Sequence, residues 1–174
     1  MSRSKRTGQA GFSLIELLIV LAILAISANL AIPGFQGMQG RQRLVAASEQ
    51  VYGMLSLAKG EARKRGTEIT LDIAIDAGDS TDWALGLRDT AASAAACDPT
   101  TAGSCTLSFR EADGSLRQQE KVLRSSDYPG VTLAANRADI HFDPVRSTAS
   151  ALTFTLTGGG RSVLVRLSAT GRVR

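Results

Sequence analysis

Gly11-Phe12-Ser13-Leu14-Ile15-Glu16-Leu17 opens a long uncharged run that decides the fold. The next charged residue after Glu16 is Arg41, and apolar side chains are densest between residues 17 and 32. A membrane-spanning helix needs about 20 mostly apolar residues, so this run is long enough to cross a bilayer. Glu16 is an acid near the start of that helix, where it is costly in lipid and requires a cationic partner. We therefore treat Glu16 as a candidate functional residue.

The residues before this stretch are polar and basic. They include Arg3, Lys5 and Arg6 and no acid, which favours a cytoplasmic location for this end of the chain. A cleaved secretory signal has an apolar stretch of roughly 7–15 residues followed by small residues at the cleavage site. Here Ala10 and Gly11 precede a longer apolar stretch. A cleaved secretory signal and a plain signal anchor are therefore the less favoured alternatives.

In register with the basic leader and the apolar helix, residues 11–17 resemble the class III signal of type IV pilins and type II secretion pseudopilins. The resemblance implies that a prepilin peptidase cuts between Gly11 and Phe12 on the cytoplasmic side. The same enzyme would methylate the new amine of Phe12. The carboxylate of Glu16 would then pair with that amine in a neighbouring subunit of a filament. A buried acid without such a partner is strongly penalised.

The resemblance and the residue pattern together predict four segments. Residues 1–11 form the leader that is removed, and residues 12–35 form a transmembrane helix that becomes part of the filament core. Residues 36–66 continue as an amphipathic helix, and residues 67–174 form a β-rich domain. The expected location is the bacterial inner membrane, with a single pass and the C-terminal domain in the periplasm, followed by incorporation into a pilus or pseudopilus.

The helix is predicted to weaken between Pro33 and Gly40, where one proline and three glycines fall within eight residues. We interpret this stretch as a flexible joint. Beyond it, apolar residues recur at steps of three and four, which indicates one buried helical face. These residues are Leu44, Ala47, Val51, Leu55, Ala58 and Ala62. Lys64, Arg65 and Gly66 are typical of a helix end, so the basic run there is explained without nucleic acid.

The hydrophobic period changes to two after Gly66, which predicts strands. Strands are expected at residues 69–75, 83–87, 107–109, 121–123, 131–134 and 139–142. The clearest pair is a hairpin of residues 152–157 and 162–167, joined through Gly158-Gly159-Gly160-Arg161. The predicted fold class is therefore α+β. It is the type IV pilin fold, in which a long N-terminal helix packs on an antiparallel sheet.

The two cysteines, Cys97 and Cys105, bracket a polar loop. A domain carried across the inner membrane by this anchor lies in an oxidising compartment, which predicts a disulfide, with two free thiols as the alternative. The spacing excludes a CxxC redox site. A zinc site would need further ligands, and His141 is the one histidine of the chain.

Arginines gather near the C-terminus. No acid follows Asp143, whereas the same segment contains Arg146, Arg161, Arg166, Arg172 and Arg174. The whole chain has a net charge of +4, and the leader supplies +3 of it, so the mature chain carries only about +1. The ending Gly171-Arg172-Val173-Arg174 resembles the C-terminal motif of FimT-type minor pilins, which bind DNA in natural transformation. Arg161, Arg166, Arg172 and Arg174 are therefore candidate DNA-binding residues, with a solvated or subunit-contacting edge as the alternative.

Other polar groups are interpreted as structural. Asp76, Asp79 and Asp82 do not have the spacing of an EF-hand and are typical of a turn. His141 lies between Ile140 and Phe142 and has no neighbouring nucleophile motif. Neither a metal site nor a cofactor site is predicted, and we find no enzyme.

The resemblance implies a minor pilin of a type IV pilus, a structural subunit that primes assembly at or near the filament tip. Its expected partners are the major pilin, other minor pilins, the prepilin peptidase and the inner membrane. Three alternatives stay open at this point. One is a minor pseudopilin of a type II secretion machine, and another is a DNA-binding minor pilin. The third is a membrane-anchored periplasmic enzyme, which the lack of a catalytic constellation in the sequence disfavours.

Overall fold

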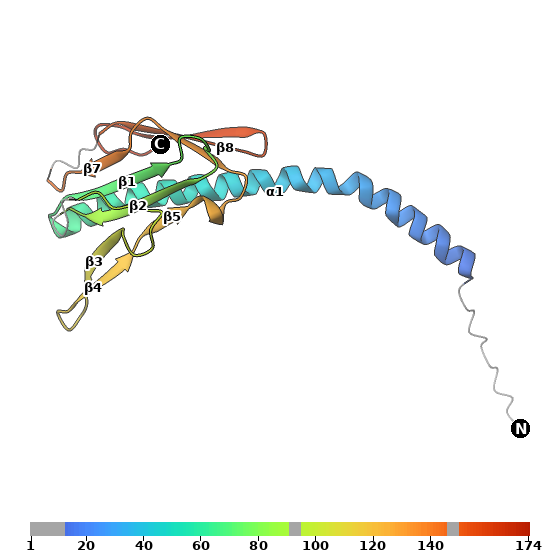
Figure 1. Cartoon of the computed structure of the whole chain (residues 1–174), viewed down its shortest axis with the longest axis horizontal. Coiled ribbons are helices and arrows are strands. Elements are labelled where there is room, and N and C mark those ends of the chain that lie inside the picture. Colours follow the sequence, from blue (N-terminus) through green and yellow to red (C-terminus); the bar gives the residue numbers. More distant parts are fainter. Residues whose placement is uncertain (1–12, 91–94, 146–149) are drawn as a thin grey trace, which may run out of the picture. The chain divides into compact units, whose positions relative to one another are not determined.

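The computed structural model describes residues 13–90, 95–145 and 150–174, except for the side chains of residues 30–34 and 36. One long helix, α1 (Leu14–Arg65), precedes all the strands (Figure 1). The strands are β1 (Ile69–Ile75), β2 (Trp83–Asp89), β3 (Thr106–Arg110), β4 (Leu116–Glu120), β5 (Val122–Arg124), β6 (Thr132–Ala135), β7 (Asp139–Phe142), β8 (Leu152–Gly158) and β9 (Arg161–Leu167). A short 3₁₀ helix, Ser125–Asp127, follows β5. The architecture is α+β, as predicted.

The chain is divided into two compact units, residues 1–37 and residues 38–174. Helix α1 runs without a break through the stretch from Pro33 to Gly40, where the sequence predicts a weakened joint. The division between the units falls inside this stretch. The backbone is therefore helical where a joint is expected. The residues before and after this division belong to different compact units.

In the first unit, large apolar side chains of α1 are exposed on every side. From Leu14 to Ile26 the exposed fractions of Leu, Ile and Val side chains range from 48% to 78%. Such a helix has no polar face of its own. Over the residues that the structure describes, no helix meets the length and hydropathy expected of a membrane span.

In the second unit, α1 buries the face that the sequence predicts. Leu44, Ala47, Val51, Leu55, Ala58 and Ala62 are each at most 2% exposed. The helix ends at Arg65, and the N–H of Gly66 donates to the carbonyl of Ala62 over 3.0 Å. Gly66 has a φ of 66°, a left-handed conformation that favours glycine. Basic side chains in this last turn complement the negative end of the helix dipole.

The described strands form three antiparallel sheets, in the orders β5-β2-β1-β7, β3-β4 and β6-β8-β9. Side chains of the first and third sheets pack with the buried face of α1 in one core. The indole N–H of Trp83 in β2 donates to the carbonyl of Val131, next to β6, over 2.9 Å. The N–H of Leu133 in β6 donates to the carbonyl of Ser80 over 3.1 Å. These bonds connect the first sheet to the third.

The hairpin of β8 and β9 approaches α1 at its tip. Gly158 pairs with Arg161, so Gly159 and Gly160 form a two-residue turn, and both have positive φ angles of 56° and 73°. This is the turn predicted from the sequence. A Cβ atom on Gly159 would lie 2.6 Å from the backbone nitrogen of Arg41, so the backbone of the turn lies directly on the helix.

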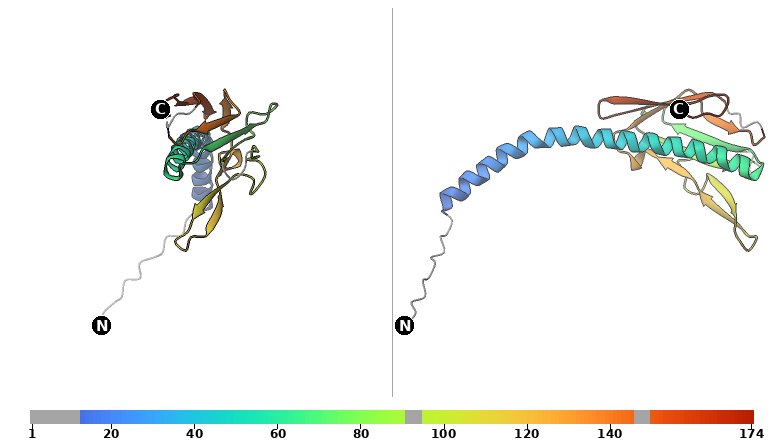
Figure 2. Two further views of the ribbon diagram at one scale, coloured as in Figure 1. Left: turned by 90° about the vertical axis from the view of Figure 1, so that its left-hand side faces the viewer. Right: turned by 180° about the vertical axis from the view of Figure 1, so that it is seen from behind.

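The hairpin of β3 and β4 extends from the domain on the side away from β8 and β9 (Figures 1 and 2). Its second strand is not predicted from the sequence. All five residues of β4 are exposed, so β4 has no buried face to impose an alternating pattern.

Candidate functional site

The C-terminal residues fold back along β9 through a tight turn. Gly171 has a φ of 69°, and its N–H donates to the carbonyl of Ser168 over 2.8 Å. The Ser168 N–H in turn donates to the carbonyl of Arg172 over 2.9 Å. Arg166 and Arg174 then exchange two backbone hydrogen bonds of 2.9 Å. The turn therefore places Arg172 and Arg174 beside β9, which itself carries Arg166.

Arg166, Arg172 and Arg174 line one open hollow of about 420 Å³. Its polar lining also includes Asn136, Thr153, Ser168 and Thr170. Arg161 lies at the other end of β9, next to the hairpin turn, and does not line this hollow. Arg146 lies outside the described residues. The structure therefore brings together three of the four arginines that the sequence singles out.

These three arginines are exposed, and among the described residues none of them forms an ion pair through its side chain. Their charges are therefore available to an anion from solution. Among the described residues that line the hollow there is no aromatic side chain, so they offer no surface on which a base could stack. The arrangement suits the phosphates of a nucleic-acid backbone or the carboxylates of a protein partner.

The basic surface continues onto α1. A second hollow, of about 360 Å³, lies between the helix and the C-terminal segment and is lined by Lys59, Arg63 and Arg172 among others. The ammonium of Lys59 donates to the carbonyl of Gly171 over 2.7 Å, which holds the C-terminal turn against the helix. Sequence reasoning did not assign Lys59 and Arg63 to this surface. Their spacing of four residues puts them on one helix face, but only the fold brings the C-terminus there.

The predicted processing site lies at the start of the chain. Gly11 and Phe12 are outside the described residues. Glu16 lies in the first turn of α1, where the carbonyl of Ser13 accepts hydrogen bonds from the N–H groups of Glu16 and Leu17. A carboxylate in this turn is favourably placed toward the positive end of the helix dipole.

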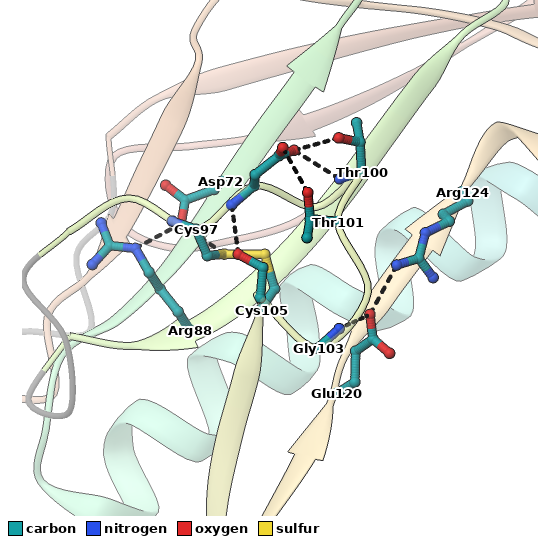
Figure 3. Close-up of a disulfide and its surroundings, with 11 residues drawn as sticks. Asp72, Arg88, Cys97, Thr100, Thr101, Gly103, Cys105, Glu120 and Arg124 are labelled. Carbon is teal, nitrogen blue, oxygen red and sulfur yellow. Dashed lines mark hydrogen bonds and ion pairs between the residues drawn. A yellow bond between two sulfur atoms is a disulfide. The ribbon is translucent and has the colours of Figure 1, made fainter.

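A disulfide joins Cys97 to Cys105 and holds the loop between them against β1 and β2 (Figure 3). The N–H of Cys97 donates to Asp72 over 3.2 Å, and the buried Arg88 donates to the same carboxylate over 2.6 Å. Within the loop, Asp98 accepts hydrogen bonds from the hydroxyl and the N–H of Thr100. These bonds, with the Thr100 hydroxyl first, lower the pKa of Asp98 below its ordinary value.

The remaining polar candidates occupy local structures. His141 is exposed on β7, where its Nδ1 lies 3.1 Å from Glu68 and its Nε2 lies 3.3 Å from Asp139. Asp79 accepts bonds from the N–H and the hydroxyl of Thr81 inside the turn between β1 and β2. Within the described ranges, no three histidine, cysteine or acidic side chains gather closely enough to hold a metal ion.

Comparison with known proteins defines the class of this molecule. A family model described as type II transport protein GspH matches residues 47–171, and one described as the prokaryotic N-terminal methylation motif matches residues 6–28. Two solved structures of the type IV minor pilin FimU from Pseudomonas aeruginosa are similar. The structure from the crystal in space group P21 matches this chain with a TM-score of 0.50 and 18% sequence identity. The match covers 77% of this chain and 88% of the FimU chain. The crystal in space group P65 has a TM-score of 0.46 at 18% identity, covering 74% and 89%. No curated relative matches the chain.

The fold and the N-terminal motif are those of type IV pilin-like structural subunits, the class that includes minor pilins and pseudopilins. The family model of type II transport protein GspH matches well over half of the sequence, so the chain belongs to the GspH family.

Proposed function

We propose that this chain is a minor pilin that helps to prime assembly of a type IV pilus at or near its tip. The observation that carries the proposal is the combination of an N-terminal methylation motif with a GspH-family domain on one long helix. The likeness to FimU supports the pilin fold alone. In the proposed cycle, the apolar run after Leu17 anchors the subunit in the inner membrane, and the β-rich domain lies in the periplasm.

Processing precedes assembly in this proposal. The prepilin peptidase removes residues 1–11 and methylates the amine of Phe12. Glu16 then pairs with the amine of a neighbouring subunit, the major pilin or another minor pilin. Replacing Gly11 by a bulkier residue is expected to leave the leader attached, as a larger product on an immunoblot of the host cells. Normal processing of that variant would contradict the assignment of the cleavage site.

The pairing is tested by the substitution Glu16→Ala. We expect processing to continue and the amount of this subunit in sheared filaments to fall at least about tenfold, because an unpaired amine remains inside the apolar bundle. Glu111→Ala is the control, since Glu111 is an exposed acid between β3 and β4 within the second unit. Unchanged filament content in the Glu16 variant would refute the pairing.

A second candidate is a minor pseudopilin of a type II secretion machine, which the description of the matching family favours. Deleting the gene in the host separates the two. Loss of surface pili with normal protein secretion supports the pilus subunit. Loss of secretion with normal piliation supports the pseudopilin.

A third candidate is a DNA-binding pilin, which the hollow lined by Arg166, Arg172 and Arg174 favours. The purified full chain in detergent would be tested by mobility shift, with Arg172→Gln and Arg174→Gln combined. If DNA binds here, each lost phosphate contact reduces the slope of log K against log salt by about 1. Arg117→Gln is the control, because Arg117 is an exposed arginine of β4 that does not line the hollow. No shift of the unaltered chain at low salt would reject DNA binding.

A further inference from the structure

Strand β9 has one edge that is only partly covered. Its pairing with β8 runs over the whole strand, from Arg161 to Leu167. On the other edge, the C-terminal segment pairs with β9 only at its end, through the reciprocal bonds of Arg166 and Arg174 and a bridge between Leu167 and Val173. The pairing that covers this edge ends at Arg174.

The uncovered part of this edge contains Ser162 and Leu164. The backbone groups of every second residue in a strand point to the same edge. Because Arg166 bonds outward to Arg174, the N–H and C=O groups of Ser162 and Leu164 also point outward. Within the described part of the chain, no hydrogen bond to these outward groups is present. An unpaired row of this kind is a template for another strand.

A hollow borders this edge of β9. A hollow of about 270 Å³ lies between β9 and α1, and its lining includes Ser48, Tyr52, Leu164 and Arg174. Leu164 is 50% exposed and Tyr52 is 48% exposed, so the hollow presents apolar surface to the solvent. Proteins usually protect a free edge with a charged residue or proline near its middle. Here a leucine occupies that position.

The charges around the hollow indicate what would fill it. Arg161 lies at one end of the uncovered stretch and Arg174 at the other, and both side chains are exposed. Glu49 is the one acid among the residues that line the hollow. An added strand with carboxylates near its ends and apolar residues between them would complement both the charges and the exposed Leu164.

We propose that the free edge of β9 binds an extended, acid-bearing segment of a partner subunit as an added β-strand. Backbone hydrogen bonds to Ser162 and Leu164 supply the affinity, and the flanking arginines select the carboxylates. This surface adjoins the hollow of Arg166 and Arg172, with which it shares Arg174. The proposal does not depend on which machine the subunit serves.

The test is site-resolved amide hydrogen exchange on the full chain in detergent. The probe is an acetylated, amidated pentapeptide of three valines between two glutamates, compared with the same peptide carrying lysines. With saturating glutamate peptide, exchange at Ser162 and Leu164 should slow by at least about tenfold. Val163 and Val165 are internal controls, because their N–H groups already face β8. The lysine peptide should protect neither outward amide.

A substitution tests the same contact. Leu164→Pro removes the outward N–H and leaves the bonds to β8 in place, a position where an edge strand accepts proline. It should weaken glutamate-peptide binding at least about tenfold, whereas Leu164→Val, which keeps the N–H, should change binding less than about threefold. If the proline variant does not fold, the exchange data on the unaltered chain decide. Equal protection by both peptides, protection by neither, or protection by a DNA oligonucleotide alone would overturn the proposal.

Discussion

Asp72 is the buried acid that holds several parts of the domain together. Its side chain is 7% exposed and accepts hydrogen bonds from Arg88 in β2 and from the backbone of Cys97. Taking an ion pair out of water costs several kcal/mol, which the contact between the charges must offset. Removing Asp72 takes its carboxylate away from the buried Arg88 guanidinium and from the Cys97 N–H.

We predict that Asp72→Ala lowers the free energy of unfolding by about 3–5 kcal/mol, measured by urea denaturation. Glu111→Ala is the control, because it removes an exposed pair with Arg117 at 3.7 Å and should cost less than about 1 kcal/mol. Similar losses in the two variants would show that burial of the Asp72 pair does not matter.

Gly86 in β2 is required by the disulfide loop that covers it. A Cβ atom there would overlap the Sγ of Cys105 and would lie 2.7 Å from its Cβ. Gly86→Ala is therefore expected to cost about 1–3 kcal/mol of stability, as an overpacked core does. Gly53→Ala places a Cβ in open space on α1, where alanine should stabilise the helix by about 0.5–1 kcal/mol. Thermal melts of both variants would show opposite shifts.

At the scale of the element, the loop between the two cysteines is held partly by Asp98. Its pKa is lowered by bonds from Thr100 and then Thr101. A carboxylate whose pKa is lower in the folded chain contributes stability that is fully present above its pKa in the unfolded chain, about 4. That contribution is lost as the pH falls through the lower pKa of the folded state.

We therefore predict that Asp98→Asn reduces the loss of stability as the pH falls below about 4, because the variant has no carboxylate to protonate there. Melting temperatures of both proteins across this range provide the measurement. Parallel curves for the variant and the unaltered chain would show that Asp98 does not contribute to the acid response.

Elements with a buried face are those that the sequence predicts well. The helix stripe from Leu44 to Ala62 and the hairpin of β8 and β9 alternate clearly, because one side of each meets the core. The sequence of strand β4 shows no such alternating pattern, because all of its residues are exposed to solvent. The half-buried Ile73 and Ile75 continue the alternation of β1 although the fully buried part ends at Asp72, so the pattern predicts the strand but not its depth of burial.

At the scale of the whole molecule, the sequence predicts the candidate site only in part. Arg166, Arg172 and Arg174 line one hollow. The alternation of residues along the last segment of the sequence is enough to suggest that Arg172 and Arg174 share a face. Lys59 and Arg63 join them through a contact between residues more than 100 positions apart in the chain, such as that of Lys59 with Gly171. No local pattern encodes such a contact, because it depends on how the final turn packs on the helix.

The contact between Gly159 and α1 joins the last hairpin to the helix within the second unit. Gly159→Ala adds a Cβ against backbone atoms of Gly40 and Arg41 at a residue with positive φ, and we predict a cost of about 2–4 kcal/mol. Gly160→Ala is the matched control, since Gly160 has the same kind of φ but open space around its Cβ. Its expected cost is about 1 kcal/mol, from the backbone alone. Equal free energies of unfolding for the two variants would show that the close approach of Gly159 to the helix does not contribute to stability.

The exposed apolar side chains from Leu14 to Ile26 restrict the geometry of any assembly. They point in all directions around the helix axis, so one neighbour would cover a sector and leave the rest in water. A ring of such helices around a wet channel would leave the inward side of each helix hydrated. Only surroundings that are apolar on all sides, such as lipid acyl chains or a bundle filled to its axis, satisfy this part of the chain.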